Sequence, residues 1–219
     1  MANHPRGRLM QDYSTKRFLL VDDFSDFRSS LKAMLRDLGA RDVDTADCGE
    51  DTLAMCRHKR YDIILHDYNL GAGKNGQQVL EELLIGKLIS HQCIFVMVTA
   101  ESSQAMVLSA LEHEPDAYLT KPFNRASLVQ RLDKLVERKD ALKPILQALD
   151  KSDPAAVLAA SVTLSQQDKR YAPLCQRYRA GALRELGRQD ELEALLSGIL
   201  ADRATPWACM ALGNLLQAH

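Results

Sequence analysis

Short apolar runs alternate with longer amphipathic stretches over the first 139 residues of the chain. The apolar runs have the length of buried strands and cover 18–21, a weaker 43–46, 63–65, 94–98 and 117–120. Between them, apolar residues recur at helical spacing in 25–38, 48–59, 77–88, 102–113 and 125–138. Strands that alternate with helices indicate βαβ units and a parallel sheet covered on both faces. The pattern therefore predicts an α/β domain.

After residue 140 the strand-like runs disappear and helical patterns follow one another. We expect helices near 143–150, 154–165, 171–186, 190–202 and from 206 to the end. Pro154 and Pro206 suit first helical turns, and Gly187 suits the position just after a helix. The chain is therefore divided into an N-terminal tail (1–15), an α/β domain (16–139) and an all-α segment of helical hairpins (140–219).

A faint internal repeat runs through the helical segment. Gly181 and Gly213 occupy corresponding places in two similar stretches, where small residues would let neighbouring helices approach closely. Their spacing is near the ~34-residue period of a tetratricopeptide repeat, although Leu192 stands where that pattern prefers alanine. A plain helical bundle remains the alternative. The last helix lacks a partner helix, so either it caps the array or, as we expect, the chain is a fragment of a longer protein.

Composition and charge narrow the possible functions. The 219 residues are 46% hydrophobic and 26% charged, which is typical of a globular protein. Lys and Arg number 28 against 29 Asp and Glu, so the basic excess of a nucleic-acid or membrane-surface binder is missing. No apolar run reaches the ~20 residues of a membrane span, and no apolar stretch follows the N-terminus as in a secretory signal. Five cysteines without CxxC spacing indicate free thiols, and we expect a cytoplasmic protein.

Polar residues with related chemistry follow the predicted strands. Asp22 and Asp23 end the first strand, Asp67 the third, Thr99 the fourth and Lys121 the fifth. Ligands bind beyond the carboxyl ends of the strands in open parallel sheets. Three converging carboxylates repel one another unless a cation such as Mg²⁺ neutralises them, and a lysine beside them can contact a phosphoryl group. This set suits a carboxylate that attacks phosphorus and becomes an aspartyl-phosphate.

Four segments together resemble the receiver domain of two-component response regulators: 20–23 (LVDD), 65–69 (LHDYN), 98–100 (VTA) and 118–123 (YLTKPF). Each closes a predicted strand, they stand in the family's order, and the resemblance covers about residues 16–139. It implies a flavodoxin-like (βα)5 fold with strand order 2-1-3-4-5. It also implies a phospho-acceptor with self-catalysed phosphotransfer and autodephosphorylation, not an enzyme acting on a separate substrate.

The resemblance assigns a role to each matching residue of the acidic group. Asp67 would be the phosphorylated residue and a ligand of Mg²⁺. Asp23 would bind the metal directly, Asp22 would act through water or as an outer ligand, and the backbone carbonyl of Asn69 would complete the set. His66, between these positions, is interpreted as a packed residue at the end of its strand.

The remaining roles concern switching and decay of the phosphoryl group. Thr99 would be the switch hydroxyl, Tyr118 the switch aromatic and Lys121 the phosphoryl-contacting cation, and the bond before Pro122 would be cis. Asn69 and Glu101, polar and small, would leave a path for the hydrolytic water. The chain departs from the family after Asn69, because the glycine-rich stretch 70–76 lacks the usual proline. This stretch also lacks the spacing of a P-loop.

The resulting functional hypothesis is a response regulator that receives a phosphoryl group from a sensor histidine kinase. Its output would be contact between the tetratricopeptide-like segment and another protein of unknown identity, with neither nucleic acid nor membrane as partner; an oligomer is left open. One alternative is an adaptor whose receiver fold binds partners without phosphorylation. Another is a DNA-binding helical output, but the basic recognition helix that it would need is not visible in the sequence.

Overall fold

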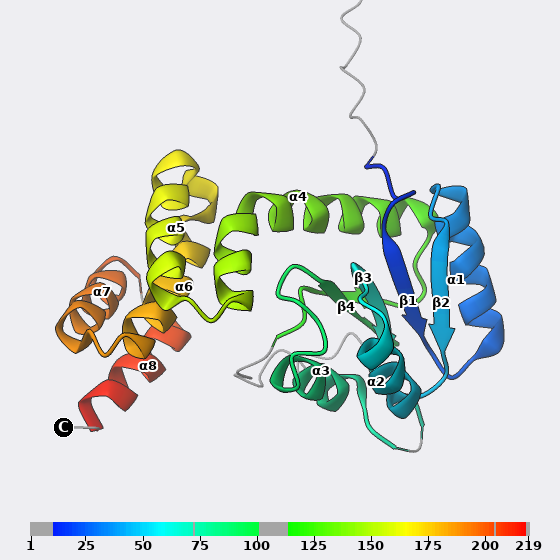
Figure 1. The fold of residues 1–219 in the computed structure, drawn as a ribbon, viewed down its shortest axis with the longest axis horizontal. Helices are drawn as coiled ribbons and strands as arrows, with labels where there is room; N and C mark the ends of the chain where they lie inside the picture. The colour runs from blue at the N-terminus through cyan, green and yellow to red at the C-terminus, as the bar shows by residue number, and fades with distance from the viewer. Residues whose placement is uncertain (1–10, 72, 101–113, 204, 218–219) are drawn as a thin grey trace, which may run out of the picture. The chain divides into compact units, whose positions relative to one another are not determined.

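A computed structural model describes residues 11–71, 73–100, 114–203 and 205–217. The chain forms two compact units, residues 1–139 and residues 140–219 (Figure 1). Among the described residues, no helix combines the length and the apolar character needed to cross a lipid bilayer.

The first unit is built on a five-stranded parallel sheet. Its strands lie in the order β2-β1-β3-β4-β5, and every neighbouring pair is parallel. This order confirms the flavodoxin-like fold implied by the sequence. The strands are β1 (Arg17–Val21), β2 (Asp42–Ala46), β3 (Ile63–Asp67), β4 (Ile94–Thr99) and β5 (Ala117–Thr120).

Helices cover both faces of this sheet (Figure 1). Alternate residues of each strand point to opposite faces, so that Phe18 and Leu20 pack under α1 and α4, whereas Leu19 and Val21 pack under α2 and α3. The predicted helix at 102–113 lies outside the described residues. The helices of this unit are α1 (Ser25–Asp37), α2 (Gly49–His58), α3 (Gly76–Ile85) and the first part of α4 (Arg125–Asp150).

The second unit is all helical, as predicted. A short 3-10 turn, η2 (Lys169–Tyr171), precedes α6, and α5 packs on α6, α6 on α7, and α7 on α8. Two apolar clusters fill the unit, one centred on Ile145 and Cys175 and the other on Leu196 and Ala208. The helices are α5 (Pro154–Gln167), α6 (Ala172–Glu185), α7 (Gln189–Asp202) and α8 (Pro206–Gln217).

Two expectations about the helical half are wrong. The sequence predicts separate helices over 125–138 and near 143–150, but α4 runs without interruption from Arg125 to Asp150 with Pro144 in its interior. Leu142 and Ile145 keep the apolar spacing and are buried, so packing outweighs the backbone hydrogen bond that the proline cannot donate. Gly181 and Gly213 are not points of close approach either, since a Cβ on either would meet no described atom within 4 Å.

Candidate functional site

Three carboxylates meet at the carboxyl edge of the sheet, as the sequence predicts. Asp22 and Asp23 follow β1, and Asp67 is the last residue of β3, the strand beside it. One carboxylate oxygen from each lies within 4.8 Å of the others. Asp22 and Asp67 are buried and Asp23 is exposed. Solvent can therefore reach the group on the side of Asp23.

Lys121 bridges the two buried carboxylates. Its Nζ lies 2.6 Å from Oδ2 of Asp22 and 2.7 Å from Oδ2 of Asp67. The backbone of Lys121 is fixed by a 2.7 Å hydrogen bond that its N–H donates to the carbonyl of Thr99. The peptide bond from Lys121 to Pro122 is cis, as the resemblance implies.

The electrostatics of this group are set by burial and by the lysine. Burial raises the pKa of Asp67; the hydrogen bond from Lys121 opposes this rise, the charge of Asp22 adds to it, and the pKa stays above its usual value. Burial alone would lower the pKa of Lys121, but its hydrogen bonds to Asp22 and Asp67 outweigh this and raise it. One ammonium faces three carboxylates, and the remaining negative charge suits a divalent cation with oxygen ligands.

A cavity of about 590 Å³ opens beside Asp67. Thr99, buried at the end of β4, lines it together with Asn69 and Lys121. Tyr118 is half-buried on β5 and packs against the apolar cluster under α2 and α3. Glu101 lies outside the described residues. The full lining is Phe24, Asp26, Phe27, Asp67, Tyr68, Asn69, Thr99, Ala100 and Lys121.

Glycines turn the loop that departs from the family pattern. Gly71 and Gly73 have positive φ angles of 74° and 104°. Residues that carry a Cβ atom rarely adopt this backbone conformation. The side chain of Asn69 accepts a hydrogen bond from the N–H of Gly71 at 3.3 Å. At the loop's end, Asn75 and Gln78 form a reciprocal capping box that starts α3. Left-handed glycines thus shape the turn where the family has a proline.

Three residues next to the acidic group make contacts that the sequence does not predict. His66 is fully buried, as expected, but its Nδ1 also lies 2.6 Å from the carbonyl oxygen of Asp67. Gly76 packs so closely that a Cβ there would lie 2.8 Å from the same oxygen. The ring of Phe27 lies under the Lys121 ammonium, 4.1 Å from Nζ to the ring centroid. The contact of His66 joins neighbouring residues but depends on how the buried ring is turned, and the other two contacts join separate segments, so the local pattern predicts none of them.

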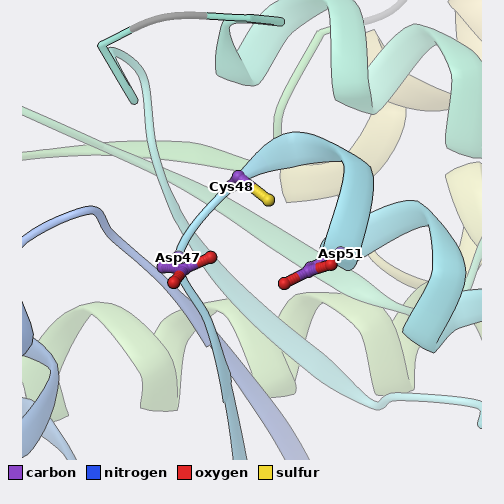
Figure 2. Close-up of side chains that lie close together, drawn as sticks. All are labelled: Asp47, Cys48 and Asp51. Atoms are coloured by element: carbon purple, nitrogen blue, oxygen red, sulfur yellow. The ribbon is translucent and has the colours of Figure 1, made fainter.

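Among the described residues, a second group has side chains that could hold a metal: Asp47, Cys48 and Asp51 (Figure 2). They are near neighbours in sequence, where β2 passes into α2. Both carboxylates are exposed, and Cys48 occupies the N-cap position of α2. Acidic side chains favour the first turn of a helix without any metal. This group is therefore explained by its place at the start of the helix.

The fold and the acidic edge define a receiver domain. Residues 18–133 match the family model described as the response regulator receiver domain, and the chain belongs to this family. It is 34% identical over 122 residues to the chemotaxis protein CheY-3 of Vibrio cholerae, covering 56% of this chain and 92% of that protein. The chemotaxis protein CheY of Pseudomonas aeruginosa is 32% identical over 122 residues, which cover 56% of this chain and 97% of that protein.

A solved structure shows the same fold. The signal receiver domain of a putative Luxo repressor protein from Vibrio parahaemolyticus superimposes with a TM-score of 0.50 and 20% identity. The match covers 57% of this chain and 92% of that one. This likeness concerns the fold of the first unit, and the family match over 18–133 makes that unit a response regulator receiver domain.

Proposed function

We propose that this chain is a response regulator that accepts a phosphoryl group on Asp67 from a sensor histidine kinase. The observation that carries the proposal is the position of the Lys121 ammonium, within hydrogen-bond distance of Asp22 and Asp67 beside a cavity. In such an arrangement the attacking carboxylate, the compensating positive charge and space for a phosphoryl group are all present before the donor arrives.

In the proposed step, a carboxylate oxygen of Asp67 forms a bond to phosphorus while the P–N bond of the donor phosphohistidine breaks. The electron pair of that bond remains on the leaving imidazole, which takes up a proton. Lys121 neutralises charge on the transferred group, and the hydroxyl of Thr99 donates to one of its oxygens. Mg²⁺, when bound, would supply further positive charge to the phosphoryl oxygens.

The donor set fits such a metal ion. Asp22, Asp23 and Asp67 bring oxygen atoms within 4.8 Å of one another. The backbone carbonyl of Asn69, next to Asp67 at the cavity, would complete the protein ligands. Hard oxygen donors in a site open to water are what Mg²⁺ requires.

We also infer that the helical unit is the output. Phosphorylation would add negative charge at the carboxyl edge of the sheet, and Thr99 and Tyr118 would shift toward it. This shift would change which conformation of β5, α4 and the helix expected at 102–113 is populated. The near-equal numbers of basic and acidic residues support a protein partner and not DNA. A tetratricopeptide-like segment would serve such contacts. The free cysteines support a cytoplasmic location.

A small phosphodonor tests the central proposal without knowledge of the kinase. With acetyl phosphate and Mg²⁺, the wild-type chain should shift in phosphate-affinity electrophoresis, and Asp67→Asn should not. Chelation of Mg²⁺ should abolish the shift. An Asp67→Asn protein that still shifts would remove Asp67 from the mechanism. A wild type that never reacts, with this donor or with histidine kinases, would favour the adaptor alternative.

The aspartyl-phosphate is expected to be short-lived. Asn69 lines the cavity and, with Glu101, would leave the hydrolytic water a path to phosphorus. Replacing both by bulky apolar residues, as in Asn69→Leu with Glu101→Leu, should lengthen the lifetime measured after the donor is removed. Equal decay in both proteins would contradict this role.

A further inference from the structure

The ammonium of Lys121 has an aromatic neighbour besides its two carboxylates. The centroid of the Phe27 ring lies 4.1 Å from Nζ, well within the ~6 Å over which a ring face attracts a cation. The carboxylates of Asp22 and Asp67 lie at 2.6 and 2.7 Å from the same nitrogen. The Lys121 side chain is only 19% exposed, so water weakens this attraction little. The ammonium is thus held by two charges and one ring face.

Packing fixes the orientation of that ring. Phe27 lies in the first turn of α1 and is half-buried against the apolar cluster under α1 and α4. Phe123 meets it edge-to-face, with ring centroids 5.9 Å apart and planes at 90°. Phe123 follows Lys121 by two residues, across the cis bond to Pro122. One short segment therefore supplies both the ammonium above the ring and the second ring that orients it.

The three contacts of the ammonium respond differently to the proposed reaction. The carboxylate of Asp67 loses charge when its oxygen bonds to phosphorus, and a bound cation would compete for Asp22. The attraction of a ring face depends on neither event. We propose that Phe27 is a positioning residue that keeps the Lys121 ammonium at the phosphoryl site while its carboxylate partners change. This inference rests on the proposed function.

The competing explanation is that Phe27 only fills space beside the core. The two explanations separate when the charge distribution of the ring changes and its shape does not. 3,4,5-Trifluorophenylalanine at position 27 keeps the ring and removes most of the negative charge from its face. Phe27→Tyr keeps that face and is the matched control. Phe27→Leu keeps an apolar side chain without any ring.

The experiment uses the full chain with acetyl phosphate and Mg²⁺, and measures the rate constant of phosphorylation. A cation–π contact of ~0.5–2 kcal/mol corresponds to a rate reduction of about two- to thirty-fold. We expect that reduction in the trifluorophenylalanine protein and in Phe27→Leu, and a near-wild-type rate in Phe27→Tyr. A fluorinated protein that reacts as fast as the wild type overturns the proposal, whatever Phe27→Leu does.

An NMR measurement reports the contact without any reaction. The ring current of Phe27 should shift the Lys121 Hε protons upfield in the wild type and in Phe27→Tyr, and this shift should vanish in Phe27→Leu. Lys121 Hε signals that are equal in the wild type and Phe27→Leu would show that the ring does not hold the ammonium. A wild type that shows the shift but never reacts with a phosphodonor would instead overturn the proposed function.

Discussion

His66 makes the stability of the receiver unit sensitive to mild acid. Its imidazole is fully buried and stacks on Phe95, with ring centroids 5.6 Å apart. Nε2 has no hydrogen-bond partner among the described residues. Burial lowers the pKa of His66 to about 4, although its contact with the Asp67 carbonyl and the charge of Asp22 favour the protonated ring. The folded protein should therefore hold this imidazole neutral well below pH 6.5.

The sign and size of the effect follow from proton linkage. Between pH 6.5 and 4 the unfolded chain binds a proton at His66 and the folded chain does not, so the free energy of unfolding falls as the pH falls. With a pKa of 6.5 in the unfolded chain and about 4 in the folded one, the loss between pH 7 and pH 5 is about 2 kcal/mol. Below pH 4 the loss levels off. Asp67, whose pKa is raised by burial, acts in the opposite direction and is present in the control protein too.

The measurement compares the wild type with His66→Leu, which has similar volume and cannot titrate. Urea unfolding followed by far-UV circular dichroism at pH 7, 6, 5.5 and 5 gives the free energy of unfolding of each. The stability of the wild type relative to the variant should fall by about 2 kcal/mol from pH 7 to 5. Parallel pH curves would refute the reasoning, as would an NMR titration of the His66 ring with a midpoint near 6.5.

Two further substitutions test contacts that join distant segments. Gly76→Ala would place a methyl group 2.8 Å from the carbonyl oxygen of Asp67 and 2.5 Å from Sδ of Met97. It should therefore lower the free energy of unfolding by about 1–3 kcal/mol and slow phosphorylation of Asp67. An unchanged midpoint of urea unfolding would show that the loop moves aside without loss of stability. Tyr13→Phe removes the hydroxyl that donates to Oδ1 of Asp133 at 2.7 Å, in a place where both residues are buried, so it should cost about 1–3 kcal/mol. Adding Asp133→Leu to Tyr13→Phe should recover part of that loss, and no recovery would argue against the hydrogen bond as its cause.

Sequence reasoning was most successful where a local pattern sufficed. The strands were recognised because short apolar runs alternated with amphipathic stretches, and Asp22 and Asp67 could be placed together because parallel strands end at the same edge of a sheet. The strand order itself came from the family resemblance. Periodicity cannot distinguish one order of parallel strands from another.

The same local reasoning failed in the helical half. The repeat predicts close helix approach at Gly181 and Gly213, but a side chain at either would meet no described atom within 4 Å. The sequence predicts separate helices over 125–138 and near 143–150, but burial of Leu142 and Ile145 keeps α4 continuous through Pro144. In both cases the outcome depended on which neighbours the residue meets, and that information is not local.

The sequence by itself determined the alternation of strands and helices, the helical character of the second half, and the residues that form the acidic edge of the sheet. Only the tertiary structure decided that Phe27 lies under Lys121 and that Gly76 packs against the carbonyl of Asp67. Propensity and periodicity act within a few residues of the chain. Contacts such as that between Phe27 and Lys121 join separate elements, and they exist only because the close packing of helices on the sheet brings those elements together.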